Sequence, residues 1–235
     1  MLSLSTALIV VLASAPAPAS WRFETGATPE VSLSAVNGSI QVEAVEGQTV
    51  SVEARREDGA DVKSFLDVEQ DGDEVSVTVC CGPCEERRAA SRCDNPVPVH
   101  LVVKVPRGSE LEVSAVGAPV KVTGVTGSLE VTTVNGDVSL IGSRGRLEVT
   151  TVGGSVDLRP DDIDNTEVST VSGNVKLKLP RDAGARVEFS SVGGRFNGGG
   201  ASMGSIERRY GDGKHPVEVS TVNGSFDLQS DSAAN

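Results

Sequence analysis

The chain has 235 residues and a formal net charge of −12, from 33 Asp and Glu against 21 Lys and Arg. This acidic balance argues against a nucleic-acid partner, because few cations are available to neutralise phosphates. One Trp, one Tyr and five Phe leave little surface for stacking on bases, and two His leave little for acid–base or metal chemistry. We therefore expect no nucleic-acid partner and no cofactor.

A short apolar segment opens the chain. Residues 8–13 are apolar but too few to span a bilayer, and Ala17-Pro-Ala19 supplies the small residues that precede a signal-peptide cleavage point. We expect residues 1–19 to be a signal peptide and the mature protein to be exported, to the periplasm, the cell surface or the medium. A buried N-terminal strand is the alternative. No later apolar stretch is long enough to predict a transmembrane segment.

Residues 20–110 are predicted to form an N-terminal β region with a loop stapled by disulfides. Residues 50–54 and 74–79 alternate between apolar and polar side chains, which predicts strands. Residues 96–106 predict a further strand limited by prolines.

All four cysteines lie in one window of this region, at Cys80, Cys81, Cys84 and Cys93. In an exported protein an even, clustered set predicts two disulfides. Neighbouring side chains of a strand point to opposite faces, so Cys80 and Cys81 should have different partners. We favour Cys80–Cys93 with Cys81–Cys84. A tetrahedral zinc site is the alternative.

A ten-residue repeat dominates residues 111–230. Copies begin at positions 33, 113, 131, 149, 168, 189 and 219, and the fourth residue of every copy is Val. Gly follows that Val two positions later except in the second copy, which has Gly117-Ala-Pro119. The predicted repeat-turn residues are Val36, Gly38, Val134, Gly136, Val152, Gly154, Val171, Gly173, Val192, Gly194, Val222 and Gly224.

Each copy has the chemistry of a strand, a tight turn and a second strand. Asn135-Gly136 predicts the turn, because both residues tolerate positive φ. The short links between copies favour an all-β β-solenoid of about seven short coils, which continues the N-terminal region as one domain. A β-sandwich or a meandering sheet is the alternative. Residues 231–235 should be a disordered tail.

The third residue of every copy is Thr, Ser or Ala, as at Thr133 and Thr151. If these side chains point inward, they form a ladder of small hydroxyls that need partners at the turn backbone. We prefer this turn-capping interpretation to a polar recognition stripe.

Candidates for chemistry are sparse. Asp161, Asp162 and Asp164 form the densest acidic group and a weak Ca²⁺ candidate, but they lack the Gly of an EF-hand loop. A solvated loop is the preferred interpretation. His100 and His215 are expected to be ordinary surface or edge residues. With no catalytic set, the chain is predicted not to be an enzyme.

Several motifs in this order resemble a known family. They are a strand ending in Cys with a second Cys after a short loop, the run from Val102 to Val113, repeated Thr-Val-Asn-Gly units, and the closing segment 217–228. The chain resembles the bacterial "putative adhesin" domain-of-unknown-function family, although it has four Cys rather than two. The resemblance implies a repetitive, solenoid-like all-β domain of envelope or secreted proteins, without catalytic residues.

These expectations combine into a function. We predict a non-enzymatic exported β-solenoid that serves as an interaction or structural module of the bacterial cell envelope, with an envelope protein or a glycan as partner. The alternatives are a carbohydrate-active enzyme or Ca²⁺-dependent glycan binder that uses the three Asp, and an envelope-stress sensing component.

Overall fold

The computed structural model describes residues 18–86, 93, 96–199 and 201–230, and the predicted signal peptide and C-terminal tail lie almost entirely outside them. The described chain is all-β. Its strands are β1 (Ala19–Glu24), β2 (Glu30–Ala35), β3 (Gly38–Val45), β4 (Thr49–Arg56), β5 (Leu66–Asp71), β6 (Glu74–Val79), β7 (Val99–Pro106), β8 (Glu110–Ala115), β9 (Val120–Thr123), β10 (Leu129–Thr133), β11 (Val138–Ile141), β12 (Leu147–Thr151), β13 (Val156–Arg159), β14 (Thr166–Thr170), β15 (Val175–Lys178), β16 (Ala185–Phe196), β17 (Ala201–Arg209), β18 (His215–Thr221) and β19 (Ser225–Gln229). Two 3₁₀ turns, η1 (Lys63–Phe65) and η2 (Cys84–Glu86), complete it.

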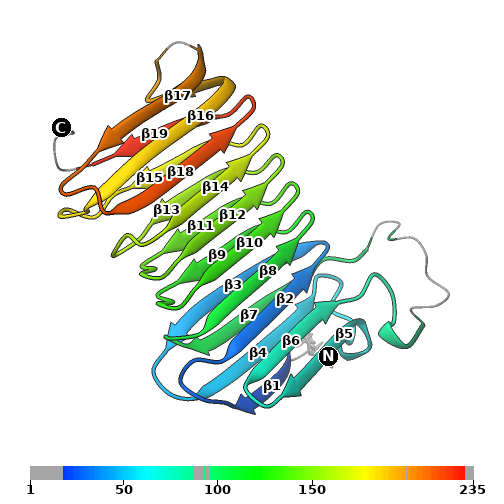
Figure 1. Cartoon of the computed structure of the whole chain (residues 1–235). Coiled ribbons are helices and arrows are strands. Elements are labelled where there is room, and N and C mark those ends of the chain that lie inside the picture. Colours follow the sequence, from blue (N-terminus) through cyan, green and yellow to red (C-terminus); the bar gives the residue numbers. More distant parts are fainter. Residues whose placement is uncertain (1–17, 87–92, 94–95, 200, 231–235) are drawn as a thin grey trace, which may run out of the picture.

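The strands form two stacks that run side by side along the molecule (Figure 1). Stack 1 contains, in spatial order, β5, β6, β2, β8, β10, β12, β14, β18, β16 and β17. Stack 2 contains β1, β4, β7, β3, β9, β11, β13, β15 and β19, and the last residues of β16 pair with β19. Each coil supplies one strand to each stack, so the protein is a β-solenoid, as predicted.

Equivalent residues of successive copies lie directly opposite one another. Val131 pairs with Val113 on one side and with Val149 on the other, in parallel register. A hairpin meander or sandwich would pair neighbouring strands antiparallel, so the parallel order excludes that alternative. Val and Leu side chains at the inward positions fill the space between the stacks and are almost fully buried.

The spatial order of the coils departs from the chain order near both ends. The coil β2–β3 lies between β6–β7 and β8–β9, so the first and second copies are neighbours although 80 residues separate them in sequence. The seventh copy, β18–β19, likewise lies between β14–β15 and β16. The segment between the first and second copies therefore supplies an additional coil, β6–β7, and antiparallel strands that cover the N-terminal end.

Four of the corners that follow stack 1 strands are held from inside by a hydroxyl group. Thr133 Oγ1 accepts the backbone N–H of Gly136 at 3.0 Å, and Thr151, Thr170 and Thr221 do the same in their coils. These hydroxyls are buried, which confirms the turn-capping interpretation.

The physical reason for Gly at the corner differs from the predicted one. Among the repeat-turn glycines only Gly38 has positive φ, at 114°. At Gly154 an added Cβ would lie 1.9 Å from the carbonyl oxygen of Gly136 in the adjacent coil, and Gly173 and Gly224 are as closely approached. Gly is needed there because neighbouring backbones lie so close together, not because the turn requires a left-handed conformation.

The disulfides are Cys80–Cys84 and Cys81–Cys93, with Cα–Cα distances of 5.5 and 5.2 Å. The expected pairing was wrong, although the adjacent cysteines do have different partners. Strand β6 ends at Val79, so Cys80 already belongs to the following turn. Cys84, at the start of η2, lies close enough to Cys80 to form the disulfide. The strand alternation on which the prediction relied therefore does not extend to the cysteines.

Candidate functional site

The outer surface of stack 1 repeats the same three side-chain types in six successive coils. In β10 the inward residues are buried, whereas Glu130, Thr132 and the following Val134 face outward. Residues i, i+2 and i+4 of an extended chain share one face, so the six coils that begin with β8, β10, β12, β14, β18 and β16 each present Glu, then Ser or Thr, then Val. The β2 coil has Ser32 at the Glu position. Because the strands are in parallel register, these residues form three rows along the solenoid.

The Val row lies where the strands end. Apart from Val36, which is half-buried, its members are 39 to 60 % exposed. The backbone N–H of Val134 donates to Ala115 at 3.1 Å and that of Gly153 donates to Val134 at 2.8 Å, so the corner continues the strand ladder. In spatial order the Val row is Val36, Val116, Val134, Val152, Val171, Val222 and Val192.

The hydroxyl row runs beside it, over the middle of the strands. Thr132 pairs with Ser114 and with Thr150, and the same register continues along the stack. In spatial order the hydroxyl row is Ser34, Ser114, Thr132, Thr150, Ser169, Ser220 and Ser190.

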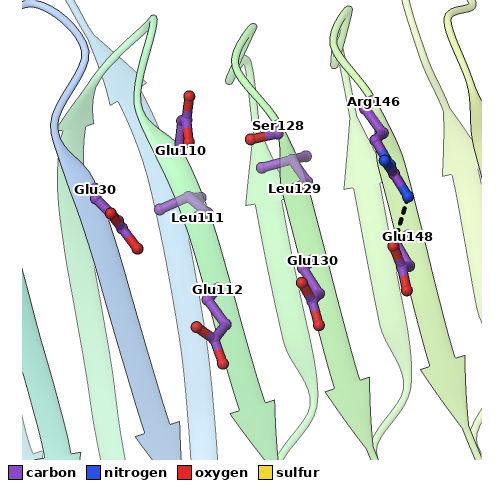
Figure 2. Close-up of a pocket in the computed structure, with 9 residues that line it drawn as sticks. All are labelled: Glu30, Glu110, Leu111, Glu112, Ser128, Leu129, Glu130, Arg146 and Glu148. Atoms are coloured by element: carbon purple, nitrogen blue, oxygen red, sulfur yellow. Dashed lines mark hydrogen bonds and ion pairs between the residues drawn. The ribbon is translucent and has the colours of Figure 1, made fainter.

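The Glu row completes the surface and places carboxylates on adjacent strands (Figure 2). In spatial order it is Glu112, Glu130, Glu148, Glu167, Glu218 and Glu188. Arg146 is 3.1 Å from Glu148, and Ser205 donates to Glu188 at 3.2 Å. Like charges directly opposite each other in a sheet repel, so this row is electrostatically unfavourable in the isolated protein.

Two shallow hollows lie on this surface. One, of about 350 Å³, is lined by glutamates near the beginnings of neighbouring stack 1 strands, including Glu110 and Glu130, and by Arg146. The other, of about 120 Å³, has a hydroxyl-rich lining that includes Ser34 and Ser114. Glu112 borders both hollows, which makes them neighbours on one face.

A third hollow, of about 640 Å³, lies at the N-terminal end and includes Arg55, Arg56 and Lys63 in its lining. Arg56 is already engaged there, since it pairs with Asp58 at 2.7 Å and stacks 4.0 Å from the centre of the Phe65 ring. This hollow does not recur in other coils, so it lacks the repetition that distinguishes the face of stack 1.

The outer surface of stack 2 differs sharply from that of stack 1. One of its rows reads Gln41, Lys121, Ser139, Asp157, Lys176 and Asp227 in spatial order, and its formal charges cancel. The two stacks share the same coils and the same apolar interior, yet only stack 1 repeats its outer residues.

A family model described as Toastrack DUF4097 matches residues 100–229, which is more than half of the chain. The chain belongs to the Toastrack DUF4097 family. The resemblance and the all-β solenoid expected from the sequence are thereby confirmed.

Three crystal structures are similar to this Toastrack protein over most of its length. A "putative cell adhesion protein" from Clostridium sporogenes is 13% identical, aligns over 91% of this chain and 99% of its own, and has a TM-score of 0.47. A "putative adhesin" from Parabacteroides distasonis is 12% identical over 91% and 97%, with a TM-score of 0.39. A "putative lipid binding protein" from the same species is 11% identical over 90% and 96%, with a TM-score of 0.28. No curated protein matches the sequence.

The three acidic residues considered for Ca²⁺ do not converge in this Toastrack domain. Asp161 lies 3.6 Å from Arg144, Asp162 accepts the N–H of Ile163 at 2.9 Å, and Asp164 lies 3.9 Å from His215. In the described part of the chain no group of three or more His, Cys, Asp or Glu is placed to hold a metal ion. The other histidine, His100, lies 2.9 Å from the hydroxyl of Ser39.

The carboxyl groups with shifted pKa values lie away from the three rows. The backbone N–H of Ala60, with Arg56, lowers the pKa of Asp58 in the N-terminal part of the chain. Lys214 lowers the pKa of Asp212 between β17 and β18. Both groups are exposed and act as local turn contacts rather than as members of a reactive site.

The Val positions of this Toastrack chain were predicted from the sequence, but the Glu row was not. The signal was present one residue before six of the seven repeat copies, as in Leu129-Glu-Val-Thr-Thr and Leu147-Glu-Val-Thr-Thr. The order in which Glu218 precedes Glu188 along the row could not be read from the sequence, because it depends on the interchange of the last two coils.

Proposed function

We propose that this protein is an exported, non-enzymatic interaction module of the bacterial cell envelope, which acts by presenting the outer face of stack 1 to a partner. The observation that carries the proposal is the Val row. Six valines that are at least 39 % exposed follow one another at the strand spacing of about 4.8 Å. The valines at other positions of the repeat, such as Val131 and Val138, are buried. Contiguous apolar surface of this kind typically marks an interaction site.

Export is supported by the two disulfides, because such bonds persist in oxidising compartments outside the cytosol. No helix in the described residues has the length and apolarity needed to cross a bilayer. The names of two similar structures, a putative cell adhesion protein and a putative adhesin, fit a binding role.

Site-specific photo-crosslinking in cells tests the binding role. A photoreactive residue at Val152 should form an adduct with an envelope component, because Val152 lies in the middle of the Val row. The same residue at Ser139, on the outer surface of stack 2, is the matched control. Equal adducts at both positions, or none at Val152, would contradict the proposal.

Cell fractionation tests the location. The protein should be found in the periplasmic, surface or extracellular fraction, and its four cysteines should resist alkylation until a reductant is added. Recovery in the cytosol with freely alkylated thiols would contradict export.

A further inference from the structure

We propose that the Val, hydroxyl and Glu rows together form a docking track for a basic amphipathic helix that lies along the long axis of the solenoid. This inference rests on the proposed interaction role and specifies the partner of the same face. The Val row contacts the apolar side of the helix, and the Glu row pairs with Lys or Arg along its flank.

Stack 2 shows that the fold does not require these rows. Stacking of coils demands repetition inside, where side chains of adjacent coils must pack in register, and both stacks repeat there. Stacking makes no such demand outside, and the outer surface of stack 2 varies from coil to coil. The repetition of Glu, hydroxyl and Val outside stack 1 therefore has a cause other than folding.

The dimensions of the face match a helix. Glu130 and Val134 are four residues apart in an extended chain, which places their rows about 13 Å apart. Thr132 lies between them, and its side chain is shorter than that of Glu130, so the hydroxyl row lies lower than the Glu row. An α-helix with side chains is about 10–12 Å wide and can rest on this hydroxyl floor while it touches both rows.

The length also matches. The Val row has seven members, and six intervals of about 4.8 Å span roughly 29 Å. A helix of about 20 residues is about 30 Å long. One turn of that helix rises about 5.4 Å, close to the spacing of the coils, so about one side chain per turn faces each member of a row.

Charge selects a basic partner over a second copy of this chain. The Glu row concentrates carboxylates at the strand spacing, and Arg146 is the cation paired with it among the described residues. The whole chain carries a net charge of −12, so two copies that met on this face would bring like charges together. Lys or Arg side chains would instead relieve the repulsion within the row.

The probe is a synthetic peptide of about 20 residues, made of Leu, Lys and Ala, with leucines along one side of the helix and lysines beside them. Fluorescence anisotropy with the mature protein should show saturable binding at about 50 mM NaCl, weakened at about 500 mM because salt screens the Glu row. A scrambled peptide of the same composition, which cannot form an amphipathic helix, should bind at least about tenfold more weakly.

Variants separate the two rows. Combined Val134→Ser, Val152→Ser and Val171→Ser should weaken binding at least about tenfold at both salt concentrations, because the apolar contact is not screened. Combined Glu130→Gln, Glu148→Gln and Glu167→Gln should weaken binding at low salt and reduce its salt dependence. Val97→Ser, an exposed valine outside the row, and Asp157→Asn with Asp227→Asn on stack 2 should leave binding within about twofold. Circular dichroism and thermal melting check that each variant folds.

Three results would overturn the inference. Equal binding of the scrambled peptide would show that the face binds any basic peptide by charge alone, without recognising a helix. Unchanged binding by the triple Val variant would remove the apolar row from the site. A dimer in sedimentation experiments that the same variant dissociates would identify a second copy as the occupant. If no helix binds but Val152 still crosslinks specifically in cells, the proposed function stands and only the helical partner is wrong.

Discussion

The central coils and the two ends of this solenoid are built by different rules. From β8 to β15 the chain follows its spatial order, and each coil repeats the residues of the one before it. At both ends the order is interchanged, and antiparallel strands close the stacks. β5 pairs with β6 at one end, and β17 pairs with β16 at the other.

The difference follows from what an end must provide. A central coil has a neighbour on both sides, so its backbone groups and apolar side chains are satisfied by repetition. A terminal coil would leave an open strand edge that invites other chains. At the C-terminal end, the side-chain oxygen of Asn197 accepts the N–H of Leu228 at 2.7 Å. Phe189, Phe196 and Phe226 pack together there, with ring centres 5.5 to 5.9 Å apart.

The largest effect is expected in the centre, from Gly154→Ala. The added Cβ would lie 1.9 Å from the carbonyl oxygen of Gly136, so adjacent coils must separate. We expect the free energy of unfolding to fall by about 3 kcal/mol or more in chemical denaturation. Gly153→Ala is the matched control, because its closest neighbour is the side-chain oxygen of Asn135 at 3.1 Å, which can move away. Equal losses in both variants would contradict the backbone-contact explanation.

At the N-terminal end, combined Cys81→Ser and Cys93→Ser should destabilise by about 3 kcal/mol in the chain-entropy model, as expected for a loop of this size. Amide hydrogen exchange should show that β5 and β6 lose protection while β10 to β13 keep theirs, because coils of a repeat protein interact mainly with neighbours. Loss of protection spread evenly over all coils would show that the ends and the centre unfold as one unit.

A smaller effect is expected at the corner of a central coil. Thr170→Val keeps the shape of the side chain but removes the oxygen that accepts the Gly173 N–H at 2.9 Å, which leaves a buried donor unpaired. We expect a loss of about 1–3 kcal/mol. Ser169→Ala, at the adjacent outward position, should change stability by less than about 0.5 kcal/mol. If the two substitutions cost the same, the buried hydroxyls do not cap the turns.

A substitution on the outer face of the central coils should raise the free energy of unfolding, whereas the preceding substitutions lower it. Glu167→Gln removes one charge from the middle of the Glu row and should raise the free energy of unfolding by about 0.3 kcal/mol, an effect that salt diminishes. Lys176→Gln on stack 2 should lower it by a similar amount, because Lys176 lies between Asp157 and Asp227. Denaturation at low and high salt measures both, and destabilisation by Glu167→Gln would contradict repulsion within the row.

The smallest effect concerns pH and distinguishes the ends from the centre. The pKa values of Asp58 and Asp212 are lowered from the ordinary value of 3.8 by the Ala60 N–H and by Lys214, respectively. Their stabilising contribution is therefore fully present above that ordinary value and is lost as the pH falls through the lowered folded-state pKa. NMR titration should give both carboxyl groups pKa values below 3.8, and Asp212→Asn should abolish this low-pH change for the β17–β18 turn. Unshifted titration of both groups would contradict these contacts.

The sequence by itself determined the repetition and its consequence. Apolar residues alternate within each copy, and the same residue type recurs at each position, which favours burial of the copies by stacking them in register. Inward Thr at the corners also follows, because a buried hydroxyl needs a partner and the turn backbone is the nearest one.

The tertiary structure alone decided what depends on contacts between distant segments. Residues 33 and 113 became neighbours, and the last two coils exchanged places, because an end must be closed by strands that no local pattern specifies. The cysteine pairing depended on where β6 stops, and the reason for the corner glycines depended on how closely two backbones approach. The Glu row, too, exists only once the coils are stacked, since a carboxylate repeated at long intervals in the sequence becomes a continuous line only at the spacing between strands.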